Sequence, residues 1–309
     1  MKDTVKPNAG AGSDSGAASN GAGPRSGATS GGASAPAPAP VWRDALAVLG
    51  SVEGTFGLSY LHLGSGESYA SSGDELYYPC SVIKVPIMCE VFRQAEQGRL
   101  DLARKVTVNR DDQVGGSGVL QVLTPGAELP VYDLITLMIV VSDNAATNML
   151  IDLVGMDGVN DLMRRLGLPD IRLYHKLMVV PVDRESVNLM SPNATTGLMT
   201  RIARNQVVSM RACESMIRIL KQQQYHDHLT KYLPLEPEPG RAAGSLPKVE
   251  VAHKNGWIEG NRCCTGIFYL PGQEYVLSVF FKDAKDNRAA DDAIAQVGKL
   301  VYDWRTATA

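Results

Sequence analysis

Three short stretches of this sequence carry side chains that could supply a nucleophile and its bases. The first is Ser81-Val-Ile-Lys84, in which the serine and the lysine lie three residues apart. If a helix begins here, both side chains lie on one face, one turn apart. A serine hydroxyl is a weak nucleophile at neutral pH and needs a neighbouring base. A lysine in an apolar setting loses part of its preference for the charged form and can act as that base.

The two other stretches have structural explanations when each is taken alone. Ser142-Asp143-Asn144 follows an apolar run, where a helix N-cap is expected. Lys254-Asn255-Gly256 lies on a predicted strand, where a lysine is ordinary and a glycine permits close backbone approach. The Ser-x-x-Lys spacing also occurs in many unrelated helices. The catalytic interpretation therefore depends on the presence of all three.

In this order, the three stretches resemble the motifs of the active-site serine penicillin-recognising enzymes, most of all the class A β-lactamases and their serine-hydrolase relatives. The resemblance covers about Trp42 to Trp304 and includes Gly115-Gly-Ser-Gly118. It implies an α+β fold: a three-layer α/β/α sheet lobe, with an antiparallel sheet formed from N- and C-terminal segments, and an all-helical lobe. It also implies a serine hydrolase that opens β-lactam rings through an acyl-enzyme on Ser81, with no metal and no cofactor.

The resemblance gives the catalytic residues distinct roles. Ser81 would attack the carbonyl of a β-lactam or acyl substrate, and Lys84 would help to take its proton. The backbone N–H groups of Ser81 and Trp257 would form an oxyanion hole, each such donor being worth roughly 3 kcal/mol. Ser142, assisted by Lys254, would relay a proton to the leaving nitrogen.

Substrate binding is expected at Asn144, Asn255, Gly256, Trp257 and Arg262. Asn144 would hold Lys84 and the amide of the substrate side chain. Asn255 stands where the family usually has threonine, and its amide can still donate to a carboxylate. Arg262, early on the next predicted strand, either pairs with a substrate carboxylate or is a hairpin arginine in solvent.

The largest departure from the family concerns hydrolysis of the acyl-enzyme. Class A enzymes carry a Glu-x-x-Leu-Asn element whose glutamate activates the hydrolytic water. The corresponding loop here contains Glu185-Ser-Val-Asn188, one residue short, and Asp183 is a second candidate acid, although either could be a solvated loop charge. Three functions stay open: a β-lactamase, a penicillin-binding or esterase-like enzyme with slow deacylation, and a non-catalytic sensor of β-lactams or peptidoglycan fragments.

The elements that must position these residues follow from apolar periodicity and turn residues. Helices are predicted at 41–52, 81–97, 131–141, 145–154, 195–204, 210–223 and 289–304. Strands are predicted at 55–63, 248–259, 262–270 and 275–281, with a short one ending at 69. Short turns between the last three make them antiparallel. We expect a sheet lobe from about 41–80 and 205–309, a helical lobe from about 81–204, and the site at their junction.

Composition excludes several classes of function. The chain has 309 residues, of which 44% are hydrophobic and 20% charged, with a formal net charge of −3. Such a chain can build one large domain or two lobes, and its weak acidity does not favour nucleic-acid binding. The longest apolar run, around 134–141, is too short to span a membrane. We expect a monomer that acts on a small molecule.

The first forty residues, Met1–Pro40, differ from the rest. They are almost wholly Gly, Ala, Ser, Pro and Asn, without an aromatic residue, and are expected to be disordered. They contain no apolar core of a secretory signal, although the family is periplasmic or secreted, so the localisation stays open. The folded domain is expected at 41–309.

The five cysteines do not form a recognisable framework. Their number is odd and their spacing does not match a metal site. Cys80 is expected to be a small packing residue, with pairing to Cys263 or Cys264 as the alternative. His226 and His228 together with Cys263-Cys264 lack the spacing of structural zinc sites.

Overall fold

The computed structural model describes residues 39–177, 187–236 and 248–308. Nearly all of the predicted disordered segment, Met1–Pro40, lies outside these ranges, so that expectation stays a prediction. Among the described residues, no helix is long and apolar enough to cross a membrane. Nor do the described residues bring together three or more His, Cys, Asp or Glu side chains in a way that could hold a metal ion.

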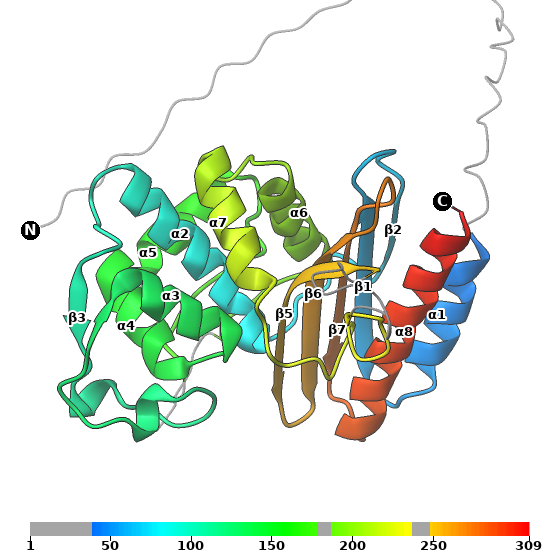
Figure 1. The fold of residues 1–309 in the computed structure, drawn as a ribbon. Coiled ribbons are helices and arrows are strands. Elements are labelled where there is room, and N and C mark those ends of the chain that lie inside the picture. Colours follow the sequence, from blue (N-terminus) through cyan, green and yellow to red (C-terminus); the bar gives the residue numbers. More distant parts are fainter. Residues whose placement is uncertain (1–38, 178–186, 237–247, 309) are drawn as a thin grey trace, which may run out of the picture. The chain divides into compact units, whose positions relative to one another are not determined.

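One antiparallel sheet joins the two ends of the domain, in the strand order β2-β1-β7-β6-β5 (Figure 1). Its N-terminal strands are β1 (Thr55–His62) and β2 (Ser68–Ser71). Its C-terminal strands are β5 (Glu250–Ile258), β6 (Asn261–Tyr269) and β7 (Tyr275–Lys282). β1 pairs with β7 along its whole length, from Thr55 opposite Lys282 to His62 opposite Tyr275. The predicted sheet built from distant segments is confirmed.

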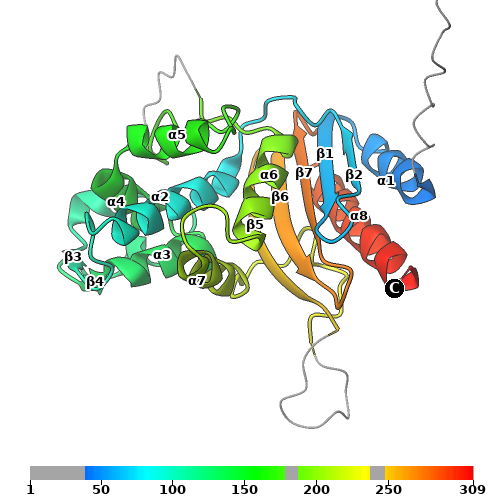
Figure 2. The ribbon, with the colours of Figure 1, turned by 90° about the horizontal axis from the view of Figure 1, so that it is seen from above.

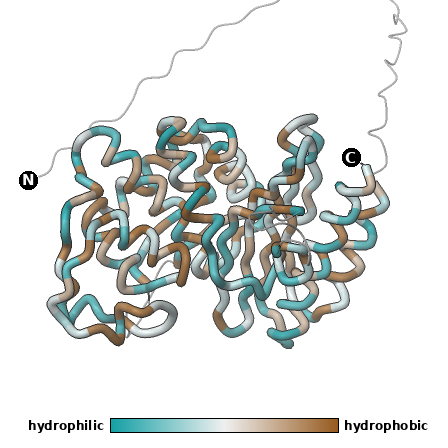
Figure 3. Tube along the Cα trace, viewed as in Figure 1, coloured by the Kyte–Doolittle hydropathy of each residue, from teal (hydrophilic) through white to brown (hydrophobic). Residues whose placement is uncertain are grey.

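Two helices cover one face of the sheet: α1 (Pro40–Gly50) and α8 (Asn287–Ala307). α8 combines hydrophilic and hydrophobic positions around its axis (Figure 3), and its apolar side packs against the sheet and α1. Trp42 of α1 stacks on Tyr69 with ring centroids 4.6 Å apart and meets Trp304 edge-on at 5.5 Å. This aromatic cluster packs α1 against α8.

A third layer, α6 (Pro192–Ala203), packs on the opposite face of the sheet against β1, β6 and β7 (Figure 2). The helix begins earlier than its apolar pattern predicts, because Ser191 caps it by accepting a hydrogen bond from the Ala194 N–H at 3.2 Å. Thr196 of α6 donates to the Ser278 hydroxyl of β7 at 2.8 Å. The predicted three-layer arrangement is confirmed.

Five further helices build the second part of the domain: α2 (Lys84–Glu96), α3 (Val131–Val140), α4 (Asn144–Val154), α5 (Met156–Arg165) and α7 (Met210–Leu220). Three short 3₁₀ helices (Cys80–Ile83, Arg110–Asp112 and Leu120–Val122) and a two-stranded ribbon of β3 (Lys105–Thr107) and β4 (Glu128–Pro130) connect them.

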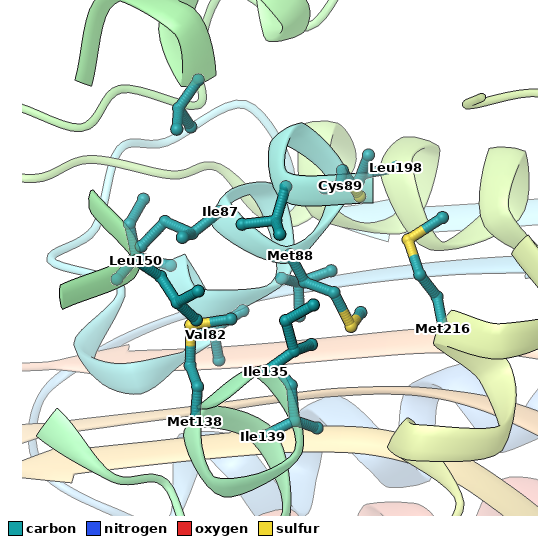
Figure 4. Close-up of a cluster of buried hydrophobic side chains, with 14 of the residues drawn as sticks. Val82, Ile87, Met88, Cys89, Ile135, Met138, Ile139, Leu150, Leu198 and Met216 are labelled. Carbon is teal, nitrogen blue, oxygen red and sulfur yellow. The ribbon is translucent and has the colours of Figure 1, made fainter. Parts of the chain in front are cut away.

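The helices enclose an apolar core that continues onto the inner face of the sheet. Figure 4 shows Met88 of α2 packed with Ile135 and Ile139 of α3, beside Leu198 of α6 and Met216 of α7. All five are fully buried. Burial of one such side chain stabilises the fold by roughly 1.5–3 kcal/mol, so this core contributes strongly to the stability of the helical part.

Candidate active site

The candidate nucleophile lies in a tighter turn than the expected helix. Ser81 belongs to the 3₁₀ turn Cys80–Ile83, and α2 begins at Lys84. In a 3₁₀ turn, side chains three residues apart eclipse one another, so the local geometry still stacks serine and lysine. Cys80, directly before the serine, has a φ of +47°. Such a conformation costs a non-glycine residue of order 1–3 kcal/mol and is typical of functional sites.

Lys84 is fully buried, and its amine has no carboxylate partner among the hydrogen bonds of the described residues. Its Nζ donates to the Ser142 carbonyl at 2.7 Å, to the Ser142 hydroxyl at 3.0 Å and to the Asn144 Oδ1 at 2.8 Å. Burial, assisted by the charge of Lys254, lowers the pKa of Lys84 well below its ordinary value, against the opposing effect of Asp143. A lower pKa makes the neutral amine more accessible, and a neutral amine can accept a proton.

The Ser-Asp-Asn stretch makes two sets of contacts, one with Lys84 and one with the backbone around it. Ser142, with a φ of +55°, and Asn144 turn toward Lys84. Asp143 caps α4 through the Ala146 N–H at 3.0 Å. Its other oxygen accepts from the Val119 and Leu120 N–H groups at 2.6 and 2.8 Å. The expected helix cap is therefore present, and the same carboxylate also fixes the 115–120 loop.

Glycines permit the close contacts of this site. A Cβ on Gly118, which has a φ of +109°, would lie 2.3 Å from the Asp143 carboxyl carbon. A Cβ on Gly256 would lie 2.3 Å from the Ser81 backbone nitrogen. β5 therefore runs directly against the 3₁₀ turn, as the Lys-Asn-Gly pattern predicts for a glycine at a close backbone approach.

Lys254 lies on the face of β5 that meets the helices, because it pairs with Thr265, whose hydroxyl bonds Ser278 beneath α6. The side chain is fully buried and its Nζ donates to the Asn255 carbonyl at 2.6 Å. Burial lowers the pKa of Lys254 to about 7, against the opposing effects of Cys264 and Cys80. The site thus contains two lysines whose pKa values are both lowered, chiefly by burial.

Asn255 and Arg262 lie on the other face of the sheet, since neighbouring strand residues alternate between faces. The Asn255 amide is buried and donates to the Tyr225 carbonyl at 3.1 Å. Arg262 is 7% exposed, and its Nε lies 2.6 Å from a carboxylate oxygen of Asp291 on α8. The structure does not bring either side chain to Ser81, in contrast to the expectation, because strand alternation directs both toward α8. Arg262 is also not the solvated hairpin arginine of the alternative.

A cavity of about 470 Å³ opens beside Ser81, within the usual size range of small-molecule sites. Of the expected residues, Ser81, Asn144 and Trp257 line it. The sequence did not predict a lining role for Tyr78, Ser117, Leu177, Ile258 and Glu259. Position along β5 was the available signal for the last two, because they directly follow Trp257.

Two other expectations concern the loop before α6 and the cysteines. Glu185 and Asp183 lie outside the described residues, so their role stays a prediction. Asn188 is buried and accepts hydrogen bonds from the Tyr174 and His175 N–H groups at 2.7 and 3.1 Å, which fixes the start of that loop. All five cysteines are free and buried, including Cys80, so the disulfide alternative does not apply to this structure.

Comparisons with known proteins bear on the family and the fold of this chain. A β-lactamase from Rhodobacter capsulatus is 33% identical over 118 residues, which span 38% of this chain and 40% of that protein, less than half its length. The crystal structure of a β-lactamase from Sphaerobacter thermophilus DSM 20745 is 29% identical, with a TM-score of 0.78 over 86% of this chain and 97% of the other. A mutant of PBP-A, solved as an acyl-enzyme complex with penicillin G, is 25% identical, with a TM-score of 0.75 over 86% and 96%.

The match to a family model is broader than the alignment with the Rhodobacter capsulatus protein and is similar in extent to the structural alignments. The model of the β-lactamase enzyme family matches residues 40–305, nearly the whole described domain. The resemblance seen in the three sequence motifs is thereby confirmed, as is the fold that it implied. This chain belongs to the β-lactamase enzyme family.

Proposed function

We propose that this protein is a serine hydrolase of the class A β-lactamase type, which opens β-lactam rings through an acyl-enzyme on Ser81. The observation that carries the proposal is Lys84. Lys84 follows the serine by one turn. Its buried amine has a strongly lowered pKa and donates hydrogen bonds to Ser142 and Asn144. A carbonyl compound in the adjoining cavity would meet a nucleophile and its base together.

In the acylation step, Lys84 takes the hydroxyl proton while the Ser81 Oγ forms a bond to the lactam carbonyl carbon. The carbonyl oxygen gains negative charge, which the N–H groups of Ser81 and Trp257 would stabilise. The close approach of β5 at Gly256 supports this pairing of donors. The carbon–nitrogen bond then breaks, and the nitrogen receives a proton through Ser142, with Lys254 nearby to favour the transfer.

Two of the residues expected to bind the substrate, Asn255 and Arg262, have a structural role in this proposal. Asn144, Gly256 and Trp257 remain candidates for binding the substrate. Asn255 and Arg262 instead support β5 and β6 from behind through Tyr225 and Asp291. No step of the proposed acylation therefore depends on an arginine in the cavity.

The fate of the acyl-enzyme separates the β-lactamase from a penicillin-binding or esterase-like enzyme. Hydrolysis needs a carboxylate that can deprotonate a water, and Glu185 is the candidate, with Asp183 as the other acid. Neither has the Glu-x-x-Leu-Asn setting of the family, and a displacement of about 1 Å can cost roughly 10²-fold in rate. We therefore propose fast acylation and slow deacylation. If deacylation did not occur at all, the protein would remain acylated and could act only as a sensor.

The test is a time course of intact mass with a penicillin, followed in parallel by the absorbance change of ring opening. The wild-type protein should gain the mass of one penicillin and release an initial burst of product close to one equivalent. Ser81→Ala should gain no mass, whereas Ser51→Ala, at an exposed serine after α1, should behave as wild type. Labelling of the Ser81→Ala variant would contradict the proposed nucleophile, and rapid turnover without a burst would contradict slow deacylation.

A further inference from the structure

One wall of the cavity beside the nucleophile is an irregular loop. Gly116 and Ser117 of this loop line the cavity. Residues 113–119 have no regular secondary structure and lie between the short 3₁₀ helices Arg110–Asp112 and Leu120–Val122. Backbone carbonyls outside a helix or sheet need donors from elsewhere. The donors that this loop finds therefore decide how firmly the wall is held.

Four consecutive carbonyls of the loop, those of residues 115–118, accept hydrogen bonds from two residues in alternation. Asn144 binds the first and the third: its side-chain amide donates to the first at 3.1 Å, and its backbone N–H donates to the third at 3.0 Å. Gln121 binds the second and the fourth, and its Nε2 donates to them at 2.6 and 3.0 Å. The loop is therefore held between a residue of the candidate site and a glutamine outside the three sequence motifs.

Gln121 is itself fixed relative to the site. It lies in the 3₁₀ helix Leu120–Val122, where the Leu120 N–H donates to the Asp143 carboxylate at 2.8 Å. Its side chain is half-buried. A side-chain amide has two N–H donors, so one glutamine can serve two carbonyls at once. These contacts form a closed ring that runs from Asp143 through Gln121 and the loop back to Asn144.

The loop also sets the orientation of the Asn144 amide. The Gly115 carbonyl accepts from its Nδ2 group, which directs its Oδ1 atom toward Lys84. The Lys84 Nζ donates to that oxygen at 2.8 Å. With the amide reversed, an N–H group would face the lysine and this hydrogen bond would be lost. Fixing the loop therefore also fixes an acceptor for the proposed base.

We propose that Gln121 is a positioning residue for the acylation of Ser81: through the 115–118 loop it keeps the Asn144 amide oxygen directed at Lys84. This inference rests on the proposed acylation. The hydrogen bond gains strength when Lys84 takes the serine proton and becomes charged. Loss of the two Gln121 donors should therefore slow the acylation step about threefold to tenfold, which corresponds to one ordinary hydrogen bond.

Rapid-mixing labelling with benzylpenicillin, well below the melting temperature, measures the step concerned. The limiting acylation rate constant reports the chemical step, and the apparent dissociation constant reports binding. Gln121→Met keeps the length of the side chain and removes both donors. It should lower the limiting rate constant about threefold to tenfold and change the dissociation constant less than about twofold. Gly115 and Gly116 are exposed, so water can bind the released carbonyls and the fold should stay intact.

Gln113→Met is the matched control, because Gln113 makes the same kind of bridge to carbonyls beyond the loop. Its amide donates to the Leu120 and Leu123 carbonyls at 2.8 and 2.7 Å. Neither leucine is among the described residues that line the cavity. This variant should lower the melting temperature and leave the limiting acylation rate constant unchanged. The pair of variants thus separates positioning of the site from general stability of this region.

Gln121→Lys tests whether the lost donors explain the effect. A lysine side chain is long enough to reach the same carbonyls and carries three donors. At high ionic strength its added charge is screened. Under that condition the limiting acylation rate constant should return close to the wild-type value.

The outcomes separate this inference from the proposed function. Equal slowing in Gln121→Met and Gln113→Met, a change confined to the dissociation constant, or an unaltered rate would overturn the positioning role and leave Ser81 acylation in place. A folded Gln121→Lys variant as slow as Gln121→Met would also overturn it. Failure of benzylpenicillin to label the wild-type protein would instead remove the proposed function, and this inference with it.

Discussion

The two faces of strand β5 carry side chains with opposite tasks. On the face toward the helices, Lys254 lies buried beside the site and Gly256 presses against the Ser81 backbone. On the face toward α8, Asn255 bonds Tyr225, and its neighbour on β6, Arg262, pairs with Asp291. Consecutive residues of one motif therefore alternate between the proposed site and the contacts that support the strand. Membership of a catalytic motif does not by itself give a side chain contact with the substrate.

The largest effect should come from Lys84 of α2, the proposed base. Lys84→Ala should slow acylation of Ser81 by roughly 10²–10⁴, the usual range for lost general-base assistance. Quenched-flow labelling followed by mass spectrometry measures this rate, and the melting temperature checks the fold. A loss below threefold in a folded variant would show that another group takes the serine proton.

Gly256→Ala should come next, because its methyl group would overlap the Ser81 backbone nitrogen. The strand or the 3₁₀ turn must then move, which costs typically 1–3 kcal/mol of stability. A shift of about 1 Å in an oxyanion donor should slow acylation by roughly 10²-fold. Gly272→Ala, at the β6–β7 turn where a Cβ meets nothing within 4 Å, is the control for changing a glycine, with only the strain of its positive φ. Wild-type acylation by Gly256→Ala would contradict the close approach.

Arg262→Met should lower the stability of the fold rather than the rate of acylation. Removing the guanidinium leaves Asp291 with one fewer partner, and the protein should lose about 1–3 kcal/mol because the carboxylate is only partly buried. Thermal unfolding should shift by several degrees, whereas acylation by benzylpenicillin should change less than threefold. A selective loss of acylation without a change in melting temperature would instead give Arg262 a place in substrate binding.

The smallest effect concerns pH and Lys254. Its folded-state pKa of about 7 lies below the value of a lysine in the unfolded chain. Above pH 7 the unfolded state therefore binds more protons, and stability rises with pH by up to about 1.4 kcal/mol per unit from this group. Urea unfolding of wild type and Lys254→Met between about pH 7 and 8.5 isolates that slope as a difference. Identical slopes would show that Lys254 is not a buried, weakly basic amine.

Much of the architecture was predictable from local patterns. Apolar periodicity located the helices, and the short turns at Gly260-Asn261 and Pro271-Gly272 determined that β5, β6 and β7 are antiparallel. The three-residue spacing of Ser81 and Lys84 predicted that both lie on one side of a turn, and the two residues do belong to one turn that leads into α2. The order of the three motifs was sufficient to identify the family, which the family model then confirmed.

The tertiary structure alone decided which side chains face the substrate cavity. β5, β6 and β7 are buried on both faces, so their sequences lack the alternation that would distinguish Lys254 from Asn255 or assign Arg262 to α8. The lowered pKa of Lys84 and the set of residues that line the cavity likewise depend on how distant segments pack. Periodicity records only neighbours along the chain, whereas desolvation and exposure are set by neighbours in space.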